Sequence, residues 1–158
     1  MFFHAGGVKR LCQNFFALVV NASSHYTDEE KRAAIELRTP DKNIQKINDP
    51  RWVMLTIKDP SSRAMVGSLE ALLLANNQGE RFGNIKWTLV HPEYRRQGIA
   101  TQLKLQLESM LRESGCSGII TGIKDNNEAS IAMNAALGIS PDASIRASPG
   151  QKWYTKRF

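Results

Sequence analysis

The sequence predicts an α/β fold, in which one twisted mixed sheet carries helices on both faces. The order of the expected elements supports this prediction: helical patterns come first, two strands joined by a turn follow, and strands and helices then alternate. Residues 118–123 are almost continuously apolar, as expected for a strand that is buried on both faces and paired in parallel with a neighbour. At 158 residues, the chain has the length of one domain that can bury a real core.

Two helices are expected near the N-terminus. The first should span residues 7–21, because apolar residues recur there at helical spacing. Its core-facing stripe should contain Val8, Leu11, Cys12, Phe15 and Val19. Thr27 and Glu30 have the spacing of a capping box, which predicts the start of the second helix. The inward-facing residues of that helix should be Ala33, Ala34 and Leu37. A further short helix should start at Thr39 and Pro40.

Two antiparallel strands are expected next, at residues 52–57 and 64–74. The turn between them, at residues 59–62, is rich in residues that favour turns through local hydrogen bonds or a fixed φ. A second turn at residues 76–80 leads into a third strand at residues 85–90. This third strand should be central and should pair in parallel with the later apolar strand, across a helical crossover.

The second half of the chain should alternate helix and strand. A long amphipathic helix follows Ala100 and should end at Gly115, where a left-handed backbone costs little. Its core-facing residues should be Leu103, Leu107, Met110 and Leu111. Asn126 or Asn127 should cap the next helix, which ends near Leu137.

The loop between the third strand and the long helix is suited to bind an anion. Gly98 and Ala100 place almost no side chain between the backbone and a ligand. The first N–H groups of a helix lack intrahelical partners, and the helix dipole adds partial positive charge there. Arg95 and Arg96 add full charges suited to bidentate phosphate contacts. A pyrophosphate is therefore the expected ligand, and the alternative is an ordinary helix start with solvated charges.

The stretch from the third strand to this helix resembles the acetyl-coenzyme A signature of the Gcn5-related N-acetyltransferases (GNAT). That signature is a strand ending in Val-x-Pro, then Arg or Gln, two residues, Gly, one residue, and Gly or Ala. The same spacing is present in Val90, Pro92, Arg95, Gly98 and Ala100. The resemblance covers the chain from about Trp52 to its C-terminus. The family usually begins with a strand, and only residues 1–4 could supply it here, so this strand should be absent or very short.

The resemblance implies the acyl-CoA N-acyltransferase fold in a single domain of residues 1–158. It divides that domain into a helical acceptor-side region, residues 1–50, a cofactor-binding core, residues 51–138, and a C-terminal hairpin, residues 139–158. In the hairpin, residues 143–148 should pair with residues 152–158 through Pro149 and Gly150.

A member of this family would bind acetyl-coenzyme A as a cosubstrate and would need no metal. By resemblance, the backbone of Leu89 and Val90 would bond the pantetheine amides. The phosphates would be held by the loop and the first helical turn, namely Arg95, Arg96, Gln97, Gly98, Ile99, Ala100 and Thr101. Asn127 would bond the pantetheine as well as cap its helix, and Asn134 would also lie at the cofactor.

Direct transfer of acetyl to an amine poses two proton problems, because the amine must be neutral to attack and a thiolate must leave. Many relatives use a Glu and a Tyr, but the corresponding positions here hold Gly122 and Asn134, which cannot titrate near neutral pH. The catalytic candidates that could replace them are Glu70 and Tyr154, with Glu80 as a third. Asn134 could still orient the thioester or stabilise developing charge.

The resemblance therefore implies an N-acetyltransferase that moves acetyl from acetyl-coenzyme A to a primary amine of a small molecule or peptide. The missing Glu and Tyr support an alternative, a coenzyme A binding or regulatory module that is catalytically weak or inactive. A third class is a nucleic-acid-binding protein, because 21 basic and 15 acidic residues give a net charge of +6. No nucleic-acid partner is expected, since the chain lacks a basic helix and interleaved aromatic residues.

The cysteine content and the apolar runs bear on cellular location. Cys12 and Cys116 are too few and too far apart for a disulfide framework or a zinc site. The apolar run at residues 15–20 is too short to cross a bilayer. We therefore expect a cytoplasmic protein with reduced thiols and no membrane partner. The sequence leaves a homodimer open.

Overall fold

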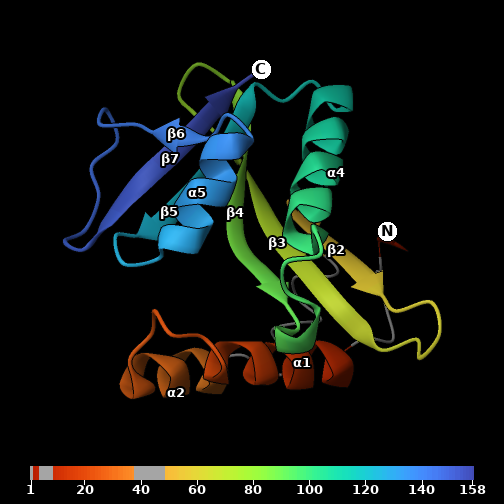
Figure 1. Ribbon diagram of the computed structural model, residues 1–158. Coiled ribbons are helices and arrows are strands. Elements are labelled where there is room, and N and C mark those ends of the chain that lie inside the picture. The colour runs from red at the N-terminus through yellow and green to blue at the C-terminus, as the bar shows by residue number, and fades with distance from the viewer. Residues whose placement is uncertain (1, 4–8, 38–48) are drawn as a thin grey trace.

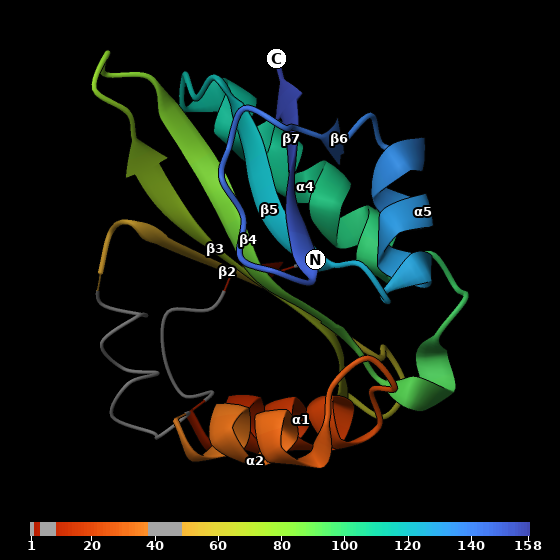
Figure 2. The ribbon, with the colours of Figure 1, turned by 90° about the vertical axis from the view of Figure 1, so that its left-hand side faces the viewer.

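The structure, a computed structural model, describes residues 2–3, 9–37 and 49–158. Within these ranges, seven strands form one sheet in the order β1-β2-β3-β4-β5-β7-β6 (Figures 1 and 2). The strands are β1 Phe2–Phe3, β2 Trp52–Lys58, β3 Met65–Ala75, β4 Arg81–Val90, β5 Gly118–Lys124, β6 Ser140–Pro141 and β7 Gln151–Arg157. β4 and β5 are parallel, and the other described neighbours pair antiparallel. The predicted mixed sheet is therefore confirmed.

Helices cover both faces of this sheet. They are α1 Lys9–Asn21, α2 Asp28–Glu36, the short 3₁₀ helix η1 Pro92–Tyr94, α4 Ile99–Glu113 and α5 Glu128–Ala136. Figure 2 shows α1 and α2 together beneath one side of the sheet, and α4 and α5 together on the other side. α1, α2, α4 and α5 appear where the sequence predicted helices, with Thr27 and Glu30 forming the expected capping box of α2.

The apolar core is divided by the sheet. Met54 and Leu55 are neighbours on β2, so their side chains point to opposite faces. Leu55 belongs to the core under α4, which contains the predicted stripe of Leu103, Leu107 and Leu111, with Met110 partly buried beside it. Met54 belongs to the core over α1, whose described members on that helix are Phe15, Phe16, Val19 and Val20. Each helix layer therefore buries its own stripe, and the predicted core positions Phe15 and Val19 are confirmed.

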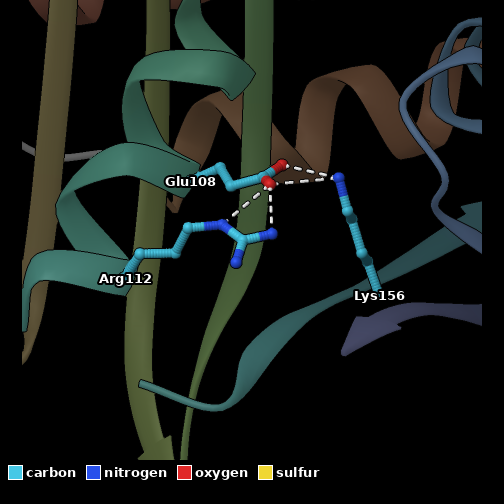
Figure 3. A network of polar contacts seen from close by, with 3 residues as sticks. All are labelled: Glu108, Arg112 and Lys156. Carbon is cyan, nitrogen blue, oxygen red and sulfur yellow. Dashed lines mark hydrogen bonds and ion pairs between the residues drawn. The ribbon is translucent and has the colours of Figure 1, made fainter. Parts of the chain in front are cut away.

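The far end of α4 is tied to β7 by a charged network (Figure 3). Glu108 accepts hydrogen bonds from Lys156 Nζ at 2.9 and 3.0 Å and from Arg112 Nε and Nη2 at 3.1 and 2.9 Å. Lys156 comes from β7, whereas Arg112 lies one turn along α4. This network joins the C-terminal half of the helix to the sheet, and the N-terminal half then points toward the end of β4.

Two sequence predictions for α2 and the C-terminus are wrong. Of the three residues predicted to face inward, Ala34 does pack against the core, but Ala33 is exposed and Leu37 is 64 % exposed. Ile35, which was not predicted, packs beside Ala34. The reason is that α2 lies beside α1 rather than on the sheet, so only a narrow stripe of it is covered (Figure 1). The predicted strand at residues 143–148 is also absent from this part of the described chain.

The strand that pairs with β7 is instead β6, through Ser140 opposite Thr155 and Pro141 opposite Tyr154. Asp142 ends it, because its Oδ1 accepts a hydrogen bond from the Ser144 backbone N–H at 3.0 Å and forms a tight turn. The residues that follow therefore leave the sheet as a loop.

The remaining predictions for the N-terminal half have different outcomes. β1 is only two residues long and pairs with Thr56 and Leu55, which confirms the expectation of a very short first strand. The helix predicted at Thr39 and Pro40 lies outside the described residues, as do the side chains of Val8, Leu11 and Cys12. Within the described ranges, no helix combines the length and the apolar composition needed to cross a membrane.

Candidate functional site

The site begins where β4 and β5 separate. Their parallel pairing runs from Phe82 opposite Gly118 to Ile85 opposite Thr121, where the Thr121 hydroxyl donates a hydrogen bond to Ile85 O at 3.1 Å. β4 then continues to Val90 without further pairing to β5. Figure 1 shows the two strands bending apart below this point.

A bulge in β4 lies at the same place. Glu70 of β3 is opposite Trp87, and Ala71 is opposite Ile85, so Lys86 is the extra residue. Two residues apart on a regular strand, Ile85 and Trp87 would face the same side of the sheet. Because of the extra residue, Ile85 packs in the core under α4, whereas Trp87 and Leu89 pack in the core over α1. The bulge therefore reorients β4 where it leaves its parallel neighbour.

The separated strands enclose a cavity of about 740 Å³, which is within the usual range for small-molecule and cofactor sites. Its walls come from β4 and β5, from the end of η1 and the loop that leads into α4, from the starts of α4 and α5, and from the end of α1 with the loop that follows it. Gln151 of β7 also lines it. No Asp or Glu lines it among the described residues. Within the same described ranges, no three His, Cys, Asp or Glu side chains are grouped as metal ligands.

One end of the cavity is an anion-binding terminus. α4 starts after Gly98, whose φ of 76° is left-handed, and no side chain caps the helix. A Cβ built on Gly98 would meet no heavy atom within 4 Å, so the space in front of the first turn is open. Arg95 and Arg96 line the cavity beside this turn. Unpaired N–H groups, the helix dipole and two guanidinium groups therefore act on the same space.

Most of the predicted cofactor residues line this cavity. They are Leu89, Val90, Arg95, Arg96, Gly98, Ile99, Ala100, Thr101 and Asn127. Asn127 also caps α5, since its Oδ1 accepts a hydrogen bond from the Ser130 backbone N–H at 3.3 Å. Gln97 and Asn134 are not part of the cavity wall.

None of the predicted catalytic residues, Glu70, Tyr154 and Asn134, is part of the cavity wall. Glu70 is fully buried on β3. Tyr154 is 3 % exposed on β7, opposite Thr121, inside the core under α4. Asn134 is fully buried between α5 and α4. Glu80, the third replacement considered, pairs with Arg157 at 2.9 Å in the region before β4.

The loop between α1 and α2 closes one side of the cavity. Lys124 at the end of β5 forms an ion pair with Glu30 of α2 and lies 5.0 Å from the centre of the Tyr26 ring. Tyr26 in turn lies 6.2 Å from Trp87, centre to centre. Burial raises the pKa of the Tyr26 hydroxyl, while burial and then the nearby Lys124 charge lower the pKa of His25. No local pattern indicates these contacts, because their partners are far apart in the sequence.

A second group that sequence reasoning missed is Lys104. It lines the cavity from α4, is only 3 % exposed, and donates a hydrogen bond from Nζ to Asn134 Oδ1 at 2.6 Å. Burial lowers the pKa of its ammonium to about 8. The sequence did contain a signal for its burial. Lys104 lies next to Leu103 and three positions before Leu107, so it is at the edge of the apolar stripe of α4.

Comparisons with known proteins found a matching family and similar folds. A model of the acetyltransferase (GNAT) family matches residues 20–139. Acetyltransferase plu1384 of Photorhabdus laumondii is 35% identical over 69 residues, which cover 44% of this chain and 48% of that protein, so the match spans about half of its length.

Two solved structures share the fold. PaiA N-acetyltransferase from Thermoplasma acidophilum, solved in complex with coenzyme A, has a TM-score of 0.84 at 13% identity and covers 99% of this chain and 98% of its own. An acetyltransferase of the GNAT family from Listeria monocytogenes has a TM-score of 0.73 at 10% identity, covering 99% and 94%. At these identities the likeness concerns the fold alone.

Proposed function

Because the chain belongs to the acetyltransferase (GNAT) family, we propose that it transfers acetyl from acetyl-coenzyme A directly to a primary amine. One observation carries the proposal. The cavity connects an uncapped helix terminus flanked by two arginines to the split between two parallel strands. An elongated ligand with phosphates at one end and amides along its length matches such a site. PaiA, which has the same fold, was solved with coenzyme A.

The residues present fit coenzyme A. Arg95, Arg96 and the first amides of α4 would hold its phosphates, because these groups are cationic or carry unpaired donors. The backbone of Leu89 and Val90 lies beyond the last pair between β4 and β5, so it is available to ligand amides. The Thr88 hydroxyl is buried, lines the cavity and has no hydrogen-bond partner among the described residues, so it is available to a polar group of the ligand. When bound, acetyl-coenzyme A supplies the activated acetyl thioester.

The amine must lose a proton before it attacks, and His25 is the candidate to accept it. Its imidazole lines the cavity, and its lowered pKa keeps it neutral at pH 7. A neutral imidazole can accept a proton, whereas the arginine side chains of the cavity cannot. We expect the acceptor to be a small-molecule or peptide amine that enters beside the α1–α2 loop.

A second candidate function is coenzyme A binding with little or no turnover. One observation favours it: no carboxylate lines the described part of the cavity, and neither Glu70 nor Tyr154 reaches it. In this case the protein would bind the cofactor through the same residues and act by binding alone.

Release of free thiol from acetyl-coenzyme A, measured with a panel of small amines and peptides, tests the proposal. Coenzyme A affinity should be measured on the same sample by calorimetry. Turnover with any acceptor supports acetyl transfer and removes the binding-only function. Tight binding without turnover across the panel favours the binding-only function, and the absence of binding contradicts both.

A further inference from the structure

Lys104 places a buried ammonium group at the cavity wall. It lies one helical turn after Ala100 on α4, so both residues face the same way, and both line the cavity. Only 3 % of Lys104 is exposed. A lysine is rarely buried to this extent without a paired anion, because removing its charge from water is costly.

No anion in the described part of the chain neutralises this charge. Among the described residues, no carboxylate lies within ion-pair distance of the Lys104 Nζ, and burial alone accounts for the change in its acidity. Glu108, one turn further along α4, is the carboxylate expected to reach it. Figure 3 shows that Glu108 is instead held by Lys156 and Arg112. The other titratable groups of the cavity wall are His25, Tyr26, Lys86, Tyr94, Arg95, Arg96 and Lys124, and none of them supplies a negative charge at neutral pH.

Asn134 holds the lysine in place. Its Nδ2 donates hydrogen bonds to Ser130 O at 2.7 Å and to Ser130 Oγ at 3.1 Å. These bonds identify the nitrogen side of the amide, so Oδ1 must face Lys104. Asn134 is fully buried, and the three hydrogen bonds of its side chain join it to Lys104 of α4 and Ser130 of α5. One of the three ammonium hydrogens is therefore used by Asn134, and the others remain for a ligand.

We propose that Lys104 is the residue that stabilises and protonates the sulfur leaving group, and that Asn134 is its positioning residue. The proposal rests on the acetyl transfer proposed above. As the carbon–sulfur bond breaks and the sulfur keeps the bonding electrons, Lys104 gives one Nζ proton to the sulfur and becomes a neutral amine. The acceptor amine, whose first proton His25 accepts before the attack, forms the new bond to the acetyl carbon and loses a second proton to water. Lys104 then regains a proton from solvent.

Other cavity groups are less suited to this role. Arg95 and Arg96 cannot give up a proton near neutral pH. Lys124 is paired with Glu30, and Tyr94 donates its hydroxyl hydrogen to Asp59. Lys104 has the charge that a thiolate attracts, and its pKa of about 8 lies in the range of thiols. Proton transfer between groups of similar pKa needs little driving force.

The thiol of bound coenzyme A reports the Lys104 charge directly, without turnover. Its ionisation can be followed by thiolate absorbance across pH, with the complex of desulfo-coenzyme A as the reference. In the wild-type protein, we expect the bound thiol to have a pKa lower by about one unit than free coenzyme A, as for other groups beside an opposite charge. Lys104→Met should abolish this shift. Lys58→Met, which removes a lysine outside the cavity, should retain it.

Two further variants separate charge from proton donation. Lys104→Arg should keep the lowered thiol pKa but lose most turnover, because a guanidinium group cannot donate its proton. Asn134→Asp is nearly isosteric and places a negative charge beside the ammonium, so it should return the thiol pKa toward that of free coenzyme A. It also keeps the proposal testable if Lys104→Met fails to fold.

The outcomes distinguish this proposal from the proposed function. A wild-type protein that does not bind coenzyme A contradicts both. Binding and turnover with an unshifted thiol pKa, or an equal shift in folded Lys104→Met, would overturn only the role of Lys104. A shift that is lost in Lys104→Met and in Asn134→Asp supports it.

Discussion

The Tyr94 hydroxyl donates a hydrogen bond to Asp59 Oδ2 at 2.8 Å across 35 positions of sequence. Asp59 lies in the turn between β2 and β3, where it also accepts hydrogen bonds from the backbone N–H groups of Ser61 and Ser62. Tyr94 ends η1, immediately before the two arginines of the phosphate loop, and lines the cavity. The hairpin turn therefore supports the loop that we expect to bind phosphate.

Replacing Tyr94 by Phe should weaken coenzyme A binding by about threefold, because the loop loses one hydrogen bond to a charged partner. Calorimetry on the folded variant measures this change. Asp59→Asn should give a similar loss, and the double variant should lose no more than either single one. Additive losses in the double variant would mean that the two residues act independently.

The open space in front of Gly98 makes a charge test possible with a matched control. Gly98→Asp and Gly98→Asn adopt the same left-handed backbone with similar strain, since both residues tolerate positive φ. Only Asp adds a negative charge beside the expected phosphates. We expect Asp to weaken coenzyme A binding on the order of a hundredfold more than Asn. Equal affinities, measured by calorimetry with the fold checked by circular dichroism, would show that no phosphate lies there.

Close packing of α4 on the sheet depends on Gly67 of β3. A Cβ at this position would lie 2.5 Å from Ile99 Cγ2 and 3.2 Å from Leu103 Cδ1, so Gly67→Ala must displace the start of α4. The expected loss in the free energy of unfolding is about 1–3 kcal/mol. Gly122→Ala is the control, because its Cβ would meet Trp153 at an ordinary 3.5 Å. Denaturant titrations should show the loss for Gly67→Ala alone.

Much of this fold could be predicted because its signals are local. The capping box of α2, the Asn127 cap of α5 and the small residues of the phosphate loop each lie within a few positions of the element they specify. The orientation of α2 was mispredicted because it depends on packing beside α1. The β6 pairing was mispredicted because the sequence pattern at residues 143–148 favours a strand. In the structure, a turn at Asp142 ends the strand before these residues.

The site was predictable on its cofactor side and not on its acceptor side. The phosphate loop carries its chemistry within six positions, whereas the pairing of Glu30 with Lys124 spans 94 positions. The contact between Lys104 and Asn134 also requires knowing that α5 packs beside α4. Sequence patterns report periodicity and spacing, but not which helix covers a given lysine.

The pair formed by Glu30 and Lys124 should hold the α1–α2 loop over the cavity. Glu30→Gln should speed hydrogen exchange of the backbone amides in residues 23–27, with only a small change in Tm, since a partly exposed pair adds little stability. Glu29→Gln, one position earlier in the same helix, is the matched control.

The Lys124 hydrogen bond lowers the pKa of Glu30, so in the wild-type protein the pair should persist at neutral pH and be lost as the pH falls through that lowered value. Identical hydrogen exchange in Glu30→Gln and Glu29→Gln would show that the Glu30–Lys124 pair does not hold the loop in place.

His25 is the expected base of the transfer. Burial and Lys124 lower the pKa of His25, so its neutral form predominates from below the ordinary value of about 6.5 upward. If His25 accepts the amine proton, kcat/KM should fall as the pH decreases through that lowered pKa. The amine substrate titrates at higher pH, so its own effect on kcat/KM appears as a separate limb on the alkaline side of the profile.

His25→Gln should remove this acidic limb and lower the plateau by about a hundredfold, within the usual range for general base catalysis. His91→Gln is the control, because His91 lies outside the cavity and its Nδ1 only accepts a hydrogen bond from the Glu93 backbone N–H. Folding must be monitored in the same pH series. An unfolded chain binds a proton at His25 more readily than the folded one, so stability should also fall as the pH drops below about 6.5. An acidic limb that persists unchanged in folded His25→Gln would assign the amine proton to water or to another group.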